Sequence, residues 1–345
     1  MNRTLIAIVT LAMLLLAGAS ELYAGRGDKA GTSAASELLI PVGGREVALG
    51  GSSLASTRGV EAIYWNPAGL ARSYSATEAL FSHMSYIADI GVDYFAVGST
   101  FEGFGSIGLS LKSLSFGEIE ITTEDVPDGT GAFYSPTYVT VGLTYSRLLT
   151  DRISVGLTAN LISERIDRVS ATGVAFDAGV QYSEFAGLRG LSIGVAVKNI
   201  GPGMKFGGPG LLRPASVGGA LRPESLYEVV AASDELPSTI ELGVAYAYQL
   251  EEMHQLTASS LFQNNNLSDD EYKFGLEYGF NNTFFVRGGY NLSEQSEPNA
   301  DYIFGVSAGA GVHYAFSGLD VSIDYAFRDV SFFDANHLFS IKVGF

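Results

Sequence analysis

From Tyr74 to the last residue, apolar side chains alternate with polar or small ones in one short segment after another. In residues 153–161, for example, every odd position is apolar, while serine, glycine, threonine and asparagine fill the even ones. A period of two residues is the signature of a β-strand whose two faces meet different surroundings. The sequence therefore predicts an all-β fold with fourteen strands: 74–87, 90–101, 104–116, 136–149, 152–165, 172–185, 190–201, 237–250, 254–264, 271–281, 283–293, 302–316, 318–328 and 336–345.

The length of these segments indicates the solvent around the sheet. Most of them span 10–14 residues, whereas strands of soluble sheets average about 5–6 and a tilted membrane-crossing strand needs about 9–11. Alternation alone also fits a soluble sandwich, whose apolar faces point inward. In a membrane barrel the apolar face meets lipid and the polar face lines the lumen. The length favours an antiparallel transmembrane β-barrel of about 14 strands over residues 74–345.

The connections between the expected strands alternate in length. Links after even strands are short, near 102–103, 150–151, 251–253, 282 and 317. Links after odd strands are mostly long, at 117–135, 166–171, 202–236, 265–270, 294–301 and 329–335, and the link near 88–89 is the exception. Short turns at one end and long loops at the other are typical of outer-membrane barrels. A further strand within 211–221 would change the count.

The N-terminus has the pattern of an export signal. Arg3 precedes an apolar run from Leu5 to Ala19, and small residues follow. This predicts a signal peptide over 1–24, cleaved after Ala19 or Ala24, and Sec-type export to the bacterial outer membrane. An uncleaved anchor is the alternative, but the run of about 15 residues is short of the ~20 that a helix needs to cross a bilayer. The chain has no cysteine, which excludes a lipid-anchored N-terminus, disulfides and thiolate chemistry.

Charge and motifs argue against several function classes. The net charge of −17 disfavours a nucleic-acid partner, because such binding needs a basic surface. Histidines 83, 254, 313 and 337 fit no metal-binding spacing, and the acidic stretch 264–271 fits no calcium loop. The glycine-rich stretch 42–51 lacks the ending of a phosphate-binding loop. We therefore expect no enzymatic activity, no cofactor and no metal.

Charged residues on the polar faces of the strands are expected to face the lumen. At the lipid face each would be costly, whereas inside the barrel they can pair with one another or with a plug. Such a set either rigidifies the barrel or lines a transport path. Its members are Asp177, Lys198, Glu241, Glu277, Arg287, Asp324 and Lys342.

The last strand ends on an aromatic residue. Phe339, Ile341, Val343 and Phe345 alternate with Ser340 and two further residues that are charged or small. A terminal aromatic on an amphipathic strand resembles the signal that the outer-membrane assembly machinery reads. We expect Phe345 to carry this signal.

Residues 39–72 resemble the N-terminal signature of the PorV/PorQ proteins, which belong to the FadL superfamily of outer-membrane barrels. The stretches 198–204 and 236–237 resemble that family's mid-chain pattern, whereas 202–236 is longer than expected. The resemblance implies a barrel of fourteen strands with residues 25–73 folded into the lumen as a plug or hatch. The matching residues are Gly44, Arg45, Gly50, Gly51, Glu61, Ala62, Tyr64, Leu70 and the plug motif Trp65, Asn66, Pro67, Ala68 and Gly69.

Two functions follow from this resemblance. In the fatty-acid transport branch, the barrel binds hydrophobic small molecules and passes them across the outer membrane. In the PorV branch, the barrel takes part in type IX protein secretion or surface attachment and binds a protein cargo through its long loops. The expected surroundings are the lipid bilayer in both cases. Fold alone does not decide between them.

Overall fold

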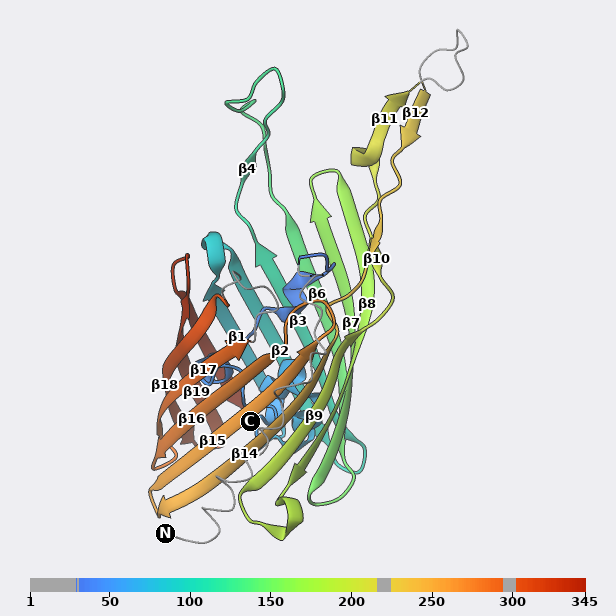
Figure 1. Ribbon diagram of the computed structural model, residues 1–345. Helices are drawn as coiled ribbons and strands as arrows, with labels where there is room; N and C mark the ends of the chain where they lie inside the picture. Colours follow the sequence, from blue (N-terminus) through green and yellow to red (C-terminus); the bar gives the residue numbers. More distant parts are fainter. Residues whose placement is uncertain (1–28, 30, 216–224, 294–301) are drawn as a thin grey trace.

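Fourteen strands of the described chain close into one antiparallel barrel (Figure 1). The computed structural model describes residues 29, 31–215, 225–293 and 302–345. In order around the barrel the strands are β1 (Thr77–Ser85), β2 (Gly91–Phe101), β3 (Gly105–Ser115), β6 (Thr137–Leu148), β7 (Ile153–Ile166), β8 (Val169–Ser183), β9 (Leu191–Ile200), β14 (Thr239–Glu251), β15 (His254–Asn265), β16 (Glu271–Phe280), β17 (Phe284–Ser293), β18 (Phe304–Phe316), β19 (Leu319–Val330) and β20 (Asn336–Gly344). The predicted fold class and strand number are confirmed.

Closure of the barrel joins the two ends of the strand series. β20 pairs with β1 from Glu78 opposite Gly344 to Ser85 opposite His337. Beyond that register, the backbone of Phe345 exchanges two hydrogen bonds of 2.9 Å with Thr77. Every strand of the barrel therefore has a neighbour on both sides, as a bilayer demands of backbone amides and carbonyls.

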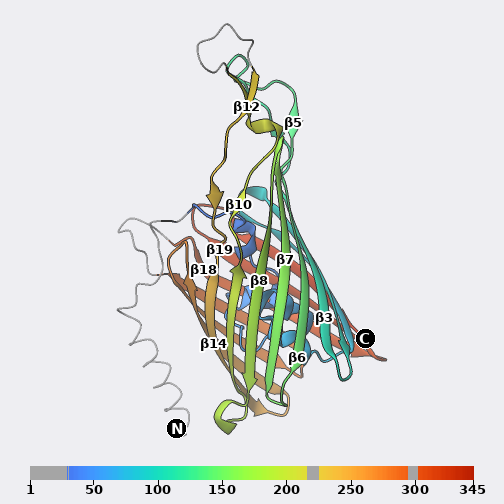
Figure 2. The same ribbon diagram turned by 90° about the vertical axis from the view of Figure 1, so that its right-hand side faces the viewer.

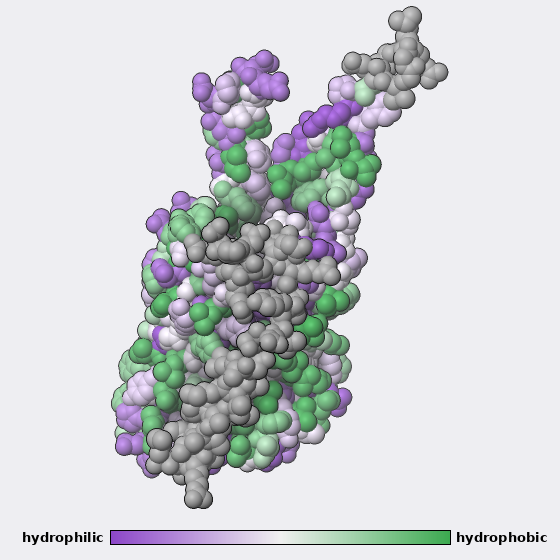
Figure 3. Space-filling model, in the orientation of Figure 1, coloured by the Kyte–Doolittle hydropathy of each residue, from purple (hydrophilic) through white to green (hydrophobic). Residues whose placement is uncertain are grey.

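The two faces of the wall are the reverse of those in a soluble sheet. On β7, the side chains of Leu157 and Leu161 point outward and are 61% and 57% exposed. On the opposite, inner face of the same strand, Ser154 and Thr158 are buried. Figure 3 shows apolar residues spread over the visible part of the wall and hydrophilic residues at the projecting ends. An apolar outer face is suited to lipid.

Three hairpins lie outside the barrel sheet. β4 (Ile119–Glu120) pairs with β5 (Phe133–Tyr134), β10 (Met204–Lys205) with β13 (Ser233–Asp234), and β11 (Leu212–Ala215) with β12 (Ser225–Glu228). They project from the same end of the barrel (Figures 1 and 2). We call 117–136 and 201–238 the two arms. β11 accounts for part of the suspected strand at 211–221 and leaves the barrel count unchanged; the rest of that stretch lies outside the described residues.

The link between β7 and β8 differs from the prediction. A loop was expected over 166–171, but both strands continue and leave only Asp167 and Arg168 between them. Asp167 has a φ of 47°, the left-handed conformation that a tight hairpin turn requires. β7 and β8 therefore approach the turn more closely than the predicted strands 152–165 and 172–185.

Short helical turns precede and connect the strands. In residues 32–73, which we call the N-terminal segment, they are η2 (Ser36–Leu39), α2 (Gly44–Ala48), η3 (Gly59–Glu61), α3 (Ala62–Trp65) and η4 (Pro67–Arg72). α2 contacts β17, β18, β19 and β20, whereas η4 contacts β3, β6, β7 and β8 across the barrel. Links elsewhere contain η5 (Ile87–Asp89), η6 (Phe185–Gly187) and η7 (Pro209–Leu211). Within the described residues, no helix has both the length and the apolar character needed to cross a membrane.

Glycines in the strands allow the N-terminal segment to approach the wall closely. A Cβ atom on Gly156 would stand 2.3 Å from the carbonyl carbon of Pro67, and one on Gly179 only 2.0 Å from Oδ1 of Asn66. On the other side, a Cβ on Gly289 would stand 2.3 Å from the amide nitrogen of Gly50. Strand glycines are expected where another backbone comes this close.

Candidate functional site

The Trp-Asn-Pro-Ala-Gly motif forms the turn from α3 into η4. Asn66 lies in the extended region, and its side-chain oxygen accepts from the amide of Ala68 at 3.2 Å, while Pro67 follows at the first helical position. The Asn66 amide group donates to the carbonyls of Leu54 at 3.1 Å and Val180 at 3.2 Å. One side chain thus caps the turn, ties it to the N-terminal segment and ties it to β8. This is the use of asparagine before proline that helix capping predicts.

Gly69 and Trp65 complete the same turn. A Cβ on Gly69 would stand 2.3 Å from the carbonyl oxygen of Thr57, so the packing admits only glycine there. The indole Nε1 of Trp65 donates to the carbonyl of Val42 at 3.0 Å. Its ring meets that of Tyr64 edge-on, with centroids 5.1 Å apart. The five motif residues therefore lie in one packed unit beside the barrel wall.

An ion network connects α2 to the wall. Arg45 binds Glu277 through two nitrogens, with Nε–Oε2 and Nη2–Oε1 distances of 3.0 and 3.1 Å. Its Nη1 also lies 2.6 Å from Glu46 Oε1. Arg287 binds both Glu277 and Asp324, each at 2.6 Å. Glu277, Arg287 and Asp324, which were predicted to face the lumen, are buried in the structure, and Glu277 is the one that pairs with Arg45 of the N-terminal segment.

A second ion pair joins η3 to the last strand. Lys342 Nζ lies 2.8 Å from Glu61 Oε2. Burial alone would raise the pKa of Glu61, but Lys342 and then Arg45 hold it below its usual range. For Glu46, burial outweighs the attraction of Arg45 and raises the pKa. Glu61 is thus an ionised partner of the wall.

The remaining predicted charges lie together around β8, β9 and β14. Lys198 pairs with Glu241 at 3.1 Å, and its Nζ also lies 4.7 Å from the ring centroid of Tyr64. Asp177 accepts from the Asn199 amide at 2.7 Å and from Asn160 Nδ2 at 2.8 Å. Asp177 sits where the register between β8 and β9 shifts. A carboxylate therefore fills the irregularity and binds the backbone amide that the shift leaves free.

A cavity of about 250 Å³ separates part of the N-terminal segment from the wall. Aromatic rings and charged side chains line it together, and Lys198 and Arg328 lie over aromatic rings. The rings belong to Tyr64, Trp65, Tyr86, Tyr302 and Phe304, and the charges to Lys198, Glu241, Glu271, Lys273 and Arg328. Aromatic walls with a few placed polar groups are the common form of a small-molecule site.

The first turn of the N-terminal segment rests on a buried group of charges. Lys112 Nζ donates to the carbonyl of Glu37 at 2.6 Å and also to that of Ile40. Glu164 accepts from the amide of Ala35 at 3.0 Å. Neither carboxyl oxygen of Glu37 meets a donor among the described residues. The charge of Glu164 also acts on Glu37, so two ionised carboxylates there would repel each other, which favours a proton on Glu37.

This arrangement predicts a pH-dependent docking of residues 34–40. Burial, and then the charge of Glu164, raise the pKa of Glu37 from 4.5 to about 8. Because the docked state binds the proton more tightly than the undocked one, docking is strongest below pH 4.5 and weakens as the pH rises to about 8. The ratio of proteolytic cleavage rates of wild type and Glu37→Gln, taken at each pH, should rise through this window. A constant ratio would contradict the assignment.

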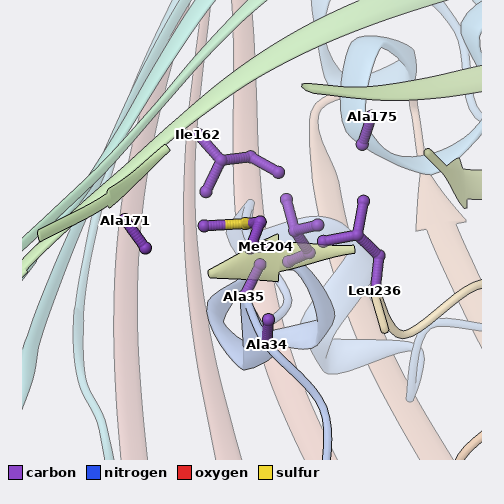
Figure 4. Packing of buried hydrophobic residues seen from close by; sticks show 8 residues of the cluster. Ala34, Ala35, Ile162, Ala171, Ala175, Met204 and Leu236 are labelled. Atoms are coloured by element: carbon purple, nitrogen blue, oxygen red, sulfur yellow. The ribbon is translucent and has the colours of Figure 1, made fainter. Parts of the chain in front are cut away.

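The base of the longer arm packs on the start of the N-terminal segment (Figure 4). Met204 of β10 points among Ile162 and Ala171 of the wall and Ala35, and Leu236 closes the group from the other side of the arm. The Ala34 amide also donates to the carbonyl of Glu235 at 3.0 Å. The long insertion is thus continuous with the packing inside the barrel.

Several residues of the site were not predicted. Lys112, Glu164, Lys273 and Arg328 are buried or half-buried on inner faces, in the same alternating rows as the predicted charges, so the alternation rule could have found them. Arg45, Glu46 and Glu61 are different because they lie outside any strand. No sequence pattern connects Arg45 to Glu277, which is 232 positions away.

Solved structures of similar fold include two toluene transporters and a monoaromatic hydrocarbon channel. The toluene transporter TbuX of Ralstonia pickettii is 13% identical, with a TM-score of 0.55, over 88% of this chain and 98% of that one. The toluene transporter TodX of Pseudomonas putida is 12% identical, with a TM-score of 0.55, over 88% and 97%. The monoaromatic hydrocarbon channel CymD is 12% identical, with a TM-score of 0.52, over the same shares. At this identity the likeness establishes the fold alone.

Fold and sequence together define the class of protein. The closed barrel with an apolar wall makes this chain an integral outer-membrane β-barrel protein. The family model of the type IX secretion system protein PorV matches residues 24–268. The chain therefore belongs to the PorV family. No curated protein matches it significantly.

Proposed function

We propose that this protein binds small hydrophobic molecules inside the barrel and passes them across the outer membrane. The cavity of about 250 Å³ between the N-terminal segment and the wall carries the proposal, because it offers aromatic surface within the barrel. The fold of TbuX, TodX and CymD, which are described as toluene transporters and a monoaromatic hydrocarbon channel, supports it. No catalytic step is part of the proposed function.

In this proposal the N-terminal segment, within residues 25–73, acts as the plug. Its contacts with opposite walls and its ion pairs to Glu277 and Lys342 support that role. A molecule would cross by way of the cavity beside it. The charged residues of the inner face would hold the plug rather than form a continuous polar path.

The route to the membrane is also proposed. Export by the Sec pathway rests on the signal at 1–24, which lies outside the described residues. Recognition by the assembly machinery rests on Phe345, whose side chain is 61% exposed beside the closing strand pair. An aromatic side chain exposed there is open to a partner before the barrel meets its final lipid surroundings.

A second function is favoured by the arms and the family. The PorV model describes a type IX secretion protein, and the arms project well beyond the wall (Figure 2). On the longer arm, the side chains of Leu226 and Val230 are 67% and 75% exposed. Exposed apolar residues at such a site are suited to a protein partner. The barrel would then hold a secreted protein at the cell surface.

The two functions predict opposite sensitivities. Leu39 lines the cavity, so Leu39→Trp should slow toluene uptake into proteoliposomes several-fold, whereas Leu39→Ala should leave it unchanged or faster. Replacing residues 207–231 by a short Gly-Ser turn should not affect uptake. Uptake equal to that of protein-free liposomes would reject the transport function. Loss of secreted proteins from the surface of cells with the trimmed arm, with uptake unchanged, would favour the second function.

A further inference from the structure

The charges around the cavity do not balance. Among the described residues that line it, Lys198, Lys273 and Arg328 are cationic, whereas only Glu241 and Glu271 are anionic. The cavity therefore carries one net positive charge, although the whole chain carries −17. The excess is local and lies inside a strongly acidic protein.

The two lysines are already neutralised. Lys198 Nζ lies 3.1 Å from Glu241 Oε1, and Lys273 Nζ lies 2.9 Å from Glu271 Oε2. Lys273 also donates to Gln263 Oε1 at 2.7 Å. These pairs leave Arg328 as the origin of the excess charge.

Arg328 forms no ion pair of its own among the described residues, because Glu271, the carboxylate whose charge attracts it, is bound to Lys273. It is 6% exposed. Its guanidinium lies 4.0 Å from the ring centroid of Phe304 and 5.9 Å from that of Tyr86. In the amide orientation that satisfies both groups, the Asn336 oxygen accepts from Nη2 at 2.8 Å. Arginine stays charged at any physiological pH, and a buried charge without a counter-ion is costly.

The size of the cavity limits what could supply the missing charge. A cavity of about 150 Å³ holds one benzene molecule. The cavity here, about 250 Å³, has room for one ring and a small substituent. Its aromatic walls suit a flat ring, since rings pack edge-to-face or offset at little cost. A carboxylate matches a guanidinium through two parallel hydrogen bonds, and as a small monoanion it supplies the one missing charge within this volume.

We propose that the cavity binds a small aromatic monoanion, a single ring bearing one carboxylate, with the carboxylate at Arg328 and the ring among Trp65, Tyr64 and Phe304. This inference rests on the proposed function and specifies its ligand as an aromatic molecule that carries one carboxylate. The ligand restores neutrality to a cavity whose other charges are paired, and its ring packs on the aromatic side chains of the lining.

The single tryptophan of the chain makes the site observable. Trp65 is the only tryptophan and it lines the cavity, so its fluorescence reports on binding there. The full-length protein in detergent is titrated with benzoate and with benzamide, its uncharged counterpart of nearly equal shape. Benzoate should bind at least about tenfold more tightly, which corresponds to about 1.4 kcal/mol. Equal affinities, or no change of fluorescence with either probe, would overturn the proposal.

Variants test whether Arg328 causes the preference for benzoate over benzamide. Arg328→Gln should abolish the difference between benzoate and benzamide, and Arg328→Lys should keep part of it. Arg152→Gln removes an equally charged residue from an exposed pair with Glu184 and should change nothing. Heat-modifiability on gels shows that each variant is folded. A preference for benzoate that survives Arg328→Gln in a folded protein counts against the site.

The outcomes separate this inference from the function it rests on. If toluene crosses proteoliposomes but benzoate binds no better than benzamide, transport stands and the anionic ligand is rejected. If benzoate binds through Arg328 but toluene does not cross, the binding site stands and passage of neutral hydrocarbons is rejected.

Discussion

Arg287→Met should lower the free energy of unfolding by about 3–5 kcal/mol, the usual cost of removing one member of a buried ion pair. The arginine contacts Glu277 and Asp324, both at 2.6 Å, and its side chain is only 3% exposed. Methionine keeps much of the volume but leaves Asp324 without its cation and Glu277 with Arg45 alone. Denaturant unfolding of the barrel in lipid vesicles, followed by Trp65 fluorescence, measures the change.

A matched control tests whether burial is the cause. Arg152 pairs with Glu184 at 3.2 Å, but both side chains are about half exposed. Exposed pairs contribute about 0–1 kcal/mol, so Arg152→Met should shift stability by no more than that. Similar losses for Arg287→Met and Arg152→Met would show that the network does not hold the N-terminal segment to the wall.

The barrel could be predicted from sequence because the residue types along each strand alternate according to the lipid on one face and the lumen on the other. On β7, Leu157 and Leu161 face outward and Ser154 and Thr158 face inward. The same rule placed Glu277, Arg287 and Asp324 on one face. Hydrophobicity with a period of two is a local property, so no knowledge of distant partners was needed.

The candidate site could be predicted only in part, because its contacts join distant parts of the chain. The arginine of α2 meets the wall 232 residues away, at Glu277. The cavity exists only where the path of residues 36–51 leaves space beside the wall. The path of an irregular segment depends on packing rather than on a repeating pattern. The resemblance to the family therefore implied a plug motif but not the residues that it contacts.

The glycines show most clearly that contacts between distant parts of the chain cannot be predicted from the sequence. The sequence has 42 glycines, and their abundance predicts close backbone packing somewhere in a sheet-rich fold. Which glycines are essential depends on the N-terminal segment. Gly288 and Gly289 are adjacent on β17, and alternation from Arg287 places Gly289 on the inner face but cannot show what lies against it. A Cβ on Gly288 would find its nearest neighbour 4.0 Å away, whereas one on Gly289 would stand 2.3 Å from Gly50 N and 2.4 Å from Leu49 C.

This pair gives a sharp test of where the N-terminal segment lies. Gly289→Ala should force Leu49 and Gly50 away from β17 and cost about 1–3 kcal/mol, as overpacking does. Gly288→Ala should be neutral or stabilise by up to about 1 kcal/mol, because alanine restricts the unfolded chain more than glycine does. Neither change disturbs the pairing of the strand, so both proteins should remain heat-modifiable barrels.

The measurement must detect displacement of the N-terminal segment as well as unfolding of the barrel. Gly51 lies against the Trp65 ring, so a displaced Gly50 should alter Trp65 emission in Gly289→Ala and not in Gly288→Ala. Limited proteolysis should cut residues 32–73 faster in Gly289→Ala alone. If the two variants are equally stable and equally resistant, the N-terminal segment does not press against β17, and the proposed plug loses the contact that fixes its position.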